Sequence, residues 1–162
     1  MPKIILQTTL HSTAEICFDL SRSIDLHKIS TVKNKEEAIA GKITGLISLG
    51  ESVTWKATHF GIRQVLTSKI TRFERPFYFR DEQVKGAFKA FKHDHYFDVS
   101  NNIVVMKDIF EFTTPFGIPG KLFNKLVLTR YMTKLLTERN AVIKVYAETG
   151  KWKLVLHGNP GA

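Results

Sequence analysis

The chain has 162 residues, 43% of them hydrophobic, and 24 Lys and Arg against 15 Asp and Glu give it a formal charge of +9. This length suits one domain, which can remove about two thirds of its surface from water and needs no disulfide or structural metal to fold. The single cysteine, Cys17, excludes an intramolecular disulfide and a zinc site built on several cysteines. No apolar run approaches the roughly 18 residues of a membrane span, and no signal-peptide pattern is present, so we expect a cytoplasmic protein.

The basic residues are spread along the chain and interleaved with acidic ones, so we predict no nucleic-acid partner. The densest basic region is 121–144, with six Lys and Arg against one Glu at helical spacing. A solvated helix face explains this pattern, and weak contact with an acidic membrane surface through Lys121, Lys125 and Lys134 is the alternative. The sequence leaves the oligomeric state open.

The first elements are short. Residues 3–10 are rich in Ile, Leu and Thr and predict a strand. The run from Ser12 to Glu15 matches a capping box with Ser12 as the helix cap, and the helix then continues to about Arg22. A second short helix, or a loop, covers 23–28. In the weakly patterned region 29–50, residues 29–33 could form a strand and 35–40 have a helical composition.

From Glu51 onward, apolar and polar residues alternate in successive runs that are separated by short breaks. These runs cover residues 51–59, 64–73, 76–84, 88–99 and 103–113. Such a series is typical of an antiparallel meander, in which neighbouring strands pair with each other. With the first strand, and with a possible one in 29–50, it predicts a sheet of about six or seven strands.

A long helix follows the last strand. Pro115 and Gly120 bracket the break, and apolar residues then recur with a helical period over 121–147, a length of about 40 Å. Gly150 ends the helix, so we expect one domain over 1–150 and a tail over 151–162. The helix must be covered by the sheet. The order of elements is α+β, and a curved sheet wrapped around one helix leaves a cavity between them.

The strands at 79–112 carry a cluster of ionisable residues. Asn101 and Asn102 fit a two-residue hairpin, and that register places His95 opposite Asp108 and His93 opposite Phe110. The turn near Gly86 brings Asp81 close to His93 and Gln83 close to Phe91. Side-chain alternation directs these residues inward and the even-numbered residues 92–98 toward water. The predicted polar cluster is Asp81, Gln83, His93, His95 and Asp108, ringed by Phe79, Phe97, Phe110 and Phe112.

Three interpretations of this cluster stay open. It is a structural network that fixes strand register, a set of polar groups that orient a ligand, or an acid–base or metal site. In the last case His95, Asp108, His93 and Asp81 are the candidate catalytic residues. A His-x-His pattern near carboxylates is weak evidence for a metal, so we predict neither a metal site nor a cofactor.

Residues outside the cluster complete the candidate ligand site. Trp55 and His59 alternate toward the cavity, and Arg130 beside the apolar stripe of the helix could hold an anionic group of a ligand. The full candidate set is Trp55, His59, Phe79, Asp81, Gln83, His93, His95, Phe97, Met106, Asp108, Phe110, Phe112, Leu126 and Arg130.

Together these motifs resemble a known superfamily. The pattern Phe79-x-Asp81-x-Gln83-x-x-Gly86, then His93-x-His95-x-Phe97, then Asp108 and Pro115-x-Gly117-x-x-Gly120, resembles a bacterial branch of the SRPBCC superfamily. That superfamily includes START-type lipid-transfer domains, birch-pollen-allergen-like proteins and polyketide cyclases. The resemblance implies a helix-grip fold with a deep apolar pocket, but no particular reaction.

These observations predict that the chain binds or carries a small, largely hydrophobic molecule. The alternative is a cyclase-, dehydratase- or hydrolase-like enzyme in which His95, oriented by Asp108, acts as general acid or base.

Overall fold

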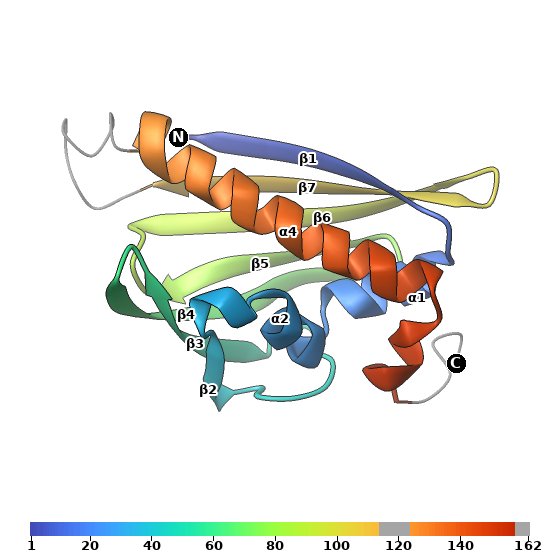
Figure 1. Ribbon diagram of the computed structural model, residues 1–162, viewed down its shortest axis with the longest axis horizontal. Coiled ribbons are helices and arrows are strands. Elements are labelled where there is room, and N and C mark those ends of the chain that lie inside the picture. The colour runs from blue at the N-terminus through green and yellow to red at the C-terminus, as the bar shows by residue number, and fades with distance from the viewer. Residues whose placement is uncertain (114–123, 158–162) are drawn as a thin grey trace.

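Seven antiparallel strands form one sheet in the computed structural model, which describes residues 1–113 and 124–157. The sheet order is β1-β7-β6-β5-β4-β3-β2, so every neighbouring pair except β1 and β7 is consecutive along the chain (Figure 1). This confirms the predicted meander. The strands are β1 (Lys3–Leu10), β2 (Glu37–Gly41), β3 (Ser52–His59), β4 (Ile62–Glu74), β5 (Tyr78–Lys85), β6 (Ala90–Ser100) and β7 (Ile103–Thr113).

Two short helices, α1 (Ala14–Ser21) and α2 (Ile24–Ser30), follow β1, and a long helix follows β7. The long helix begins with the π-helical turn η2 (Asn124–Leu128) and continues as α4 (Thr129–Glu148). Residues 121–123 of the predicted helix lie outside the described residues, as does the break between Pro115 and Gly120. The C-terminal end is as predicted, because Gly150 adopts the left-handed conformation (φ 74°) that commonly terminates helices.

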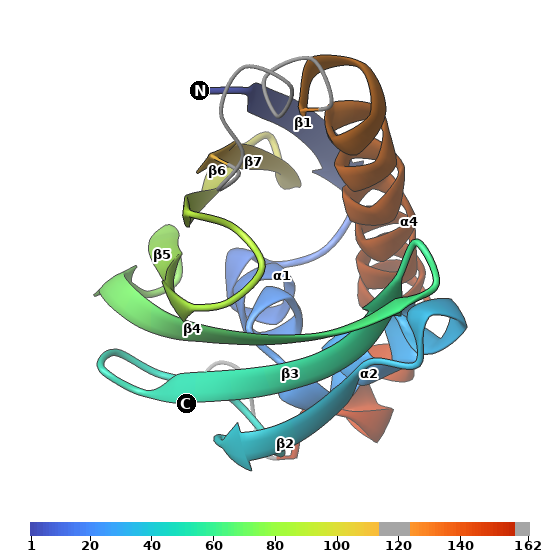
Figure 2. The same ribbon diagram turned by 90° about the vertical axis from the view of Figure 1, so that its left-hand side faces the viewer.

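The sheet curves around α1 and α4 (Figure 2). Register shifts occur between β4 and β5, at Thr67/Ser68 and at Ile70/Arg72, and such bulges bend a strand and increase its twist. Helix α4 crosses the concave side of the resulting arc, which is the helix-grip arrangement predicted from the resemblance.

The hairpin between β6 and β7 has the predicted register. Ser100 pairs with Ile103 across Asn101 (φ 49°) and Asn102 (φ 62°), the positive φ values of a type I′ turn. From that turn onward the alternation places His95 opposite Asp108. The even-numbered face of β6 differs from the prediction at one residue. Asp94 is only 4% exposed, because Tyr78 and Arg80 cover it and donate hydrogen bonds to its carboxylate.

The core lies between the sheet and the helices. Phe18 of α1 is fully buried and makes edge-to-face contacts with Phe73, Phe79 and Phe97, with ring centroids 5.2–5.4 Å apart. Each such aromatic pair contributes about 0.5–1.5 kcal/mol beyond the burial of its area. Helix α1 therefore packs on the inner face of the sheet, in the same core as Ile143 and Ala147 of α4.

Beyond α4, the segment 151–157 folds back onto this core. A single 3₁₀ turn, η3 (Lys151–Leu154), follows Gly150, and the next two residues, Val155 and Leu156, are buried among the core residues. This part of the predicted tail is therefore packed against the domain.

Three predictions near the N-terminus are wrong. Residues 29–33 are not a strand, since α2 continues to Ser30 and the 3₁₀ turn η1 (Val32–Asn34) follows it. Residues 37–41 form strand β2 despite their helical composition, because pairing with β3 outweighs the weak local propensity. The cap of α1 is Thr13 and not Ser12: the Thr13 hydroxyl accepts a hydrogen bond from the Ile16 backbone N–H.

Candidate ligand cavity

A cavity of about 560 Å³ lies between the concave face of the sheet and α4. Small-molecule sites commonly have volumes of about 300–1,000 Å³. Its wall is mainly apolar, with side chains from α2, from strands β3 to β7 and from α4. The apolar lining includes Trp55, Ala57, Leu66, Ile70, Phe79, Phe91, Leu135 and Leu136.

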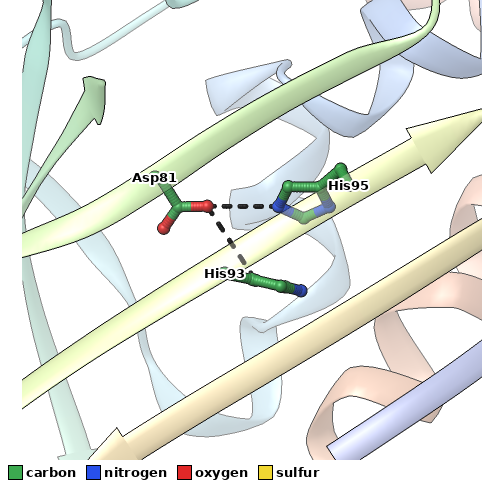
Figure 3. A group of neighbouring side chains, drawn as sticks. All are labelled: Asp81, His93 and His95. Carbon is green, nitrogen blue, oxygen red and sulfur yellow. Dashed lines mark hydrogen bonds and ion pairs between the residues drawn. The ribbon is translucent and has the colours of Figure 1, made fainter. Parts of the chain in front are cut away.

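Asp81, His93 and His95 form a polar cluster in this wall. Odd-numbered residues of β5 and β6 point to the concave face, and the register pairs Asp81 with His93. Asp81 Oδ1 lies 3.1 Å from His95 Nε2, with which it shares a hydrogen bond, and 3.9 Å from His93 Nδ1. Figure 3 shows this single oxygen directed at both imidazole rings. The sequence predicted that these three side chains come together.

Asp108 lies behind the two histidines, away from the cavity lining. Its Oδ1 is 3.1 Å from His93 Nε2 and 2.8 Å from His95 Nδ1, but the second pair is not aligned for a hydrogen bond. The other carboxylate oxygen accepts a hydrogen bond of 2.6 Å from Asn140, and Arg139 Nη1 lies 3.7 Å from Oδ1. Both histidines are therefore held between two carboxylates.

The pKa values of the two histidines shift in opposite directions. Burial lowers the pKa of His93, and the neighbouring charge of His95 lowers it further. Burial also opposes the charged form of His95, but the nearby carboxylates of Asp108 and Asp81 outweigh it and raise the His95 pKa. Burial raises the pKa of Asp81 and Asp108, yet their histidine partners outweigh this effect and leave both pKa values below the usual range. The two carboxylates thus favour the charged form of His95, while His93 is shifted toward its neutral form.

A second polar cluster lines the cavity and was missed from the sequence. His27 Nε2 of α2 lies 2.8 Å from Glu36 Oε2, and His59 Nε2 of β3 lies 3.9 Å from Glu36 Oε1. His59 Nδ1 is 2.8 Å from the Tyr131 hydroxyl on α4. The indole of Trp55 packs against the His27 ring at a centroid distance of 4.3 Å and an interplanar angle of 35°. His59 was predicted at the cavity, but His27, Glu36 and Tyr131 were not.

The candidate ligand residues divide into two sets. Seven of them line the cavity: Trp55, His59, Phe79, Asp81, His93, His95 and Phe110. The remaining seven do not line it: Gln83, Phe97, Met106, Asp108, Phe112, Leu126 and Arg130.

Each residue of the second set has a physical reason for its place. Phe97 packs on Phe18 of α1, and the Ser21 hydroxyl of α1 contacts the Met106 sulfur, so α1 separates both side chains from the cavity. Gln83 bonds the Phe88 backbone and holds the β5–β6 loop. Phe112 is enclosed by Phe88 and Phe110, whereas Leu126 and Arg130 are exposed on the outer side of the long helix.

Among the basic residues of the long helix whose side chains the structure describes, Arg139 alone lines the cavity. Arg130 and Lys134 are exposed, whereas Lys121 and the side chain of Lys125 lie outside the described residues. Among the helices that the structure describes, none is both long enough and apolar enough to cross a bilayer.

No protein-family model matches the sequence, and neither does any curated protein. Solved structures match the fold well. A protein from Thermus thermophilus aligns with a TM-score of 0.69 and 14% identity over 88% of this chain and 97% of its own. A START superfamily protein from Mycobacterium smegmatis aligns with a TM-score of 0.68 and 8% identity, over 91% of this chain and 97% of its own. Major latex-like protein 151 from Panax ginseng aligns with a TM-score of 0.64 and 16% identity, over 90% of this chain and 97% of its own. The chain therefore has the helix-grip fold of these START-like structures, as the resemblance to the SRPBCC superfamily implied.

Proposed function

We propose that the chain binds one small, largely apolar molecule in the cavity. Polar groups of this molecule contact the Asp81 cluster (Asp81, His93 and His95) and the Glu36 cluster (His27, Glu36, His59 and Tyr131). The observation that carries the proposal is the composition of the wall. Apolar side chains of the sheet and of the helices surround about 560 Å³, and they are interrupted by two groups of histidine and carboxylate side chains. A cavity of this kind supplies affinity through its apolar surface and orientation through its few polar groups.

The magnitudes fit a binding function. Ten buried CH₂ groups of a ligand would contribute about 8 kcal/mol at about 0.8 kcal/mol each. Loss of translational and rotational freedom costs several kcal/mol on binding, so apolar contact alone gives modest affinity. Hydrogen bonds to charged partners add about 1.5–3 kcal/mol each, which makes the two clusters the source of selectivity.

A pair of substitutions on β3 tests this proposal. Ala57 lines the cavity, whereas the adjacent Thr58 is exposed on the opposite face of the strand. Ala57→Phe should fill part of the cavity, so that less apolar surface of a bound molecule can be buried there. Binding of the fluorescent apolar probe ANS should therefore weaken by about 10-fold. Thr58→Phe should leave ANS binding unchanged. Equal ANS affinity in the two variants would exclude the cavity as the binding site.

Native mass spectrometry of the chain after gentle purification gives an independent measurement. A co-purified small molecule should appear with the wild type and be reduced in the Ala57→Phe variant relative to Thr58→Phe. Identification of that molecule would also establish which polar groups it carries toward Asp81 and Glu36.

A further inference from the structure

Asp81, His93 and His95 each direct one ligand atom toward the same point in the cavity wall, and these atoms lie within 4.8 Å of one another. Within residues 1–113 and 124–157, they are the only group of three or more His, Cys, Asp and Glu side chains with such an arrangement. We propose that these three side chains bind one divalent transition-metal ion. The sequence-based prediction was that no metal site is present, because the His-x-His spacing alone is weak evidence.

The donor types suit such an ion. Two imidazoles and one carboxylate are the ligand set with which proteins hold divalent transition metals while leaving positions open to other ligands. With metal–ligand bonds of about 2.1 Å, neighbouring donor atoms lie about 3.0 Å apart in octahedral and about 3.4 Å apart in tetrahedral geometry. The Asp81 oxygen is 3.1 Å from His95 Nε2 and 3.9 Å from His93 Nδ1. Because all three donor atoms lie within 4.8 Å of one another, side-chain movements of at most about 1.4 Å bring every pair of donors into this range.

The outer contacts of the histidines support the same arrangement. A metal-bound histidine generally uses its second ring nitrogen to contact a carboxylate or carbonyl, which fixes the orientation of the ring. Here one carboxylate does this for both rings, since Asp108 Oδ1 lies 3.1 Å from His93 Nε2 and 2.8 Å from His95 Nδ1. Asn140 in turn fixes Asp108 through a hydrogen bond of 2.6 Å.

The direct Asp81–His95 contact leaves one nitrogen poorly satisfied. Among the described residues, His95 Nδ1 has no aligned hydrogen-bond partner although it is fully buried. A metal between Asp81 and the two rings would replace the direct hydrogen bond and allow His95 to turn toward Asp108. The strand register, which holds Asp81 and His93 opposite each other, would remain unchanged.

The charge of the loaded site indicates what else would bind there. A divalent cation, two carboxylates and the nearby Arg139 sum to one positive charge when both imidazoles are neutral. Asp81, His93 and His95 all line the cavity, so the open coordination positions face it. A ligand oxygen with negative charge, as in a carboxylate, enolate or hydroxamate, would neutralise the site. This part of the inference rests on the proposed binding function of the cavity.

Metal titration of the chelator-treated chain tests the site directly. Isothermal titration with Zn²⁺ and visible absorption with Co²⁺ should both give one ion per chain. Asp81→Asn and His93→Gln should each weaken binding by more than about 100-fold and remove the visible Co²⁺ bands. His27→Gln is the matched control, because His27 lines the same cavity and is paired with Glu36. It should change the affinity by less than about 2-fold.

Three results would overturn the proposal. They are the absence of one-to-one binding to the wild type, unchanged affinity in a folded Asp81→Asn variant, and an equal loss in His27→Gln. If the ligand variants do not fold, histidine ring signals in the NMR spectrum of the wild type decide. Zn²⁺ must then shift the signals of two histidines other than His27, which is identified from its variant.

The ligand part has its own readout. Acetohydroxamate added to the Co²⁺-loaded chain should shift the visible bands, and an unchanged spectrum would exclude open positions on the metal. ANS binding to the chelator-treated chain measures the apolar cavity separately. Binding of ANS without metal would support the proposed function and contradict the metal site. Binding of metal without ANS would support the metal site and contradict the proposed function.

Discussion

Asp108 is 1% exposed, and its two oxygens face His93, His95, Arg139 and Asn140. We expect Asp108→Asn to lower the free energy of unfolding by about 3 kcal/mol, because it leaves positive charges buried without their counter-charge. Urea denaturation followed by circular dichroism measures this loss. Asp98→Asn, on the exposed end of the same hairpin, is the control and should change stability by less than about 0.5 kcal/mol. Similar values for the two variants would contradict a structural role for the network.

Cys17 is fully buried in α1, and burial raises the pKa of its thiol to about 12. The thiolate is the reactive form, so at pH 8 the native chain should react with the thiol reagent DTNB only through unfolding. We expect fast reaction in concentrated urea, and a rate in buffer that is slower by about the fraction of chains that are unfolded at equilibrium. A rate in buffer well above that fraction would show that α1 opens locally.

The face of the sheet to which a side chain points could be predicted from residue type and strand alternation. Whether an inward side chain meets the cavity or helix α1 could not. Phe97 and Met106 point inward, as the alternation predicts, yet they contact α1 rather than the cavity. The distinction depends on where α1 lies across the sheet, and strand periodicity carries no information about that. Glu36 was missed because its segment has a helical composition, and only pairing of β2 with β3 brings it beside His59.

At the scale of elements, the start of α1 offers a matched pair of substitutions. The Thr13 hydroxyl accepts the Ile16 N–H, whereas the sequence pattern favoured Ser12 as the cap. Thr13→Ala should lower the free energy of unfolding by about 1 kcal/mol, the usual effect of losing a capping oxygen. Ser12→Ala should have a smaller effect, measured by urea denaturation under the same conditions. A larger loss of stability in Ser12→Ala than in Thr13→Ala would support the capping box predicted from the sequence.

The strands from β3 to β7 could be predicted because burial of one face favours alternation of apolar and polar residues, which is complete in β7 and interrupted in β6 at the buried Asp94. Strand β2 could not, since it lies at the edge of the sheet and four of its five residues are exposed. The helix from 124 to 148 carries a continuous apolar stripe, so its extent followed from the sequence more reliably than the short elements before β3.

At the scale of the whole molecule, Glu36 joins α2, β2 and β3 through His27 and His59. Burial raises the pKa of the Glu36 carboxyl, but the hydrogen bond from His27 and the charges of both histidines outweigh it, and the net pKa is lowered. A carboxyl with a lowered pKa in the folded state stabilises the protein above its unfolded-state pKa and loses that effect as the pH falls through the folded value.

The unfolding free energy of the wild type should therefore exceed that of Glu36→Gln most clearly near pH 6. The difference should shrink as the pH falls below the unfolded-state pKa of the carboxyl, and it should close only below the lowered folded-state pKa, where the carboxyl is protonated in both folded and unfolded chains. Urea denaturation of both proteins across this range measures the gap. A constant difference at every pH would mean that the glutamate acts through packing rather than charge.

The pairing of β1 with β7 places one further demand on this chain during synthesis and refolding. Leu6 lies beside Asp108, so the first strand finds its partner only after roughly a hundred further residues are available, and such distant pairings slow folding. Until then the inward-facing side chains of β1, including Ile4 and Leu10, have no sheet to join. A ribosome-bound fragment ending before β7 should consequently leave β1 open to proteases, while the consecutive hairpins from β3 to β6 can already form.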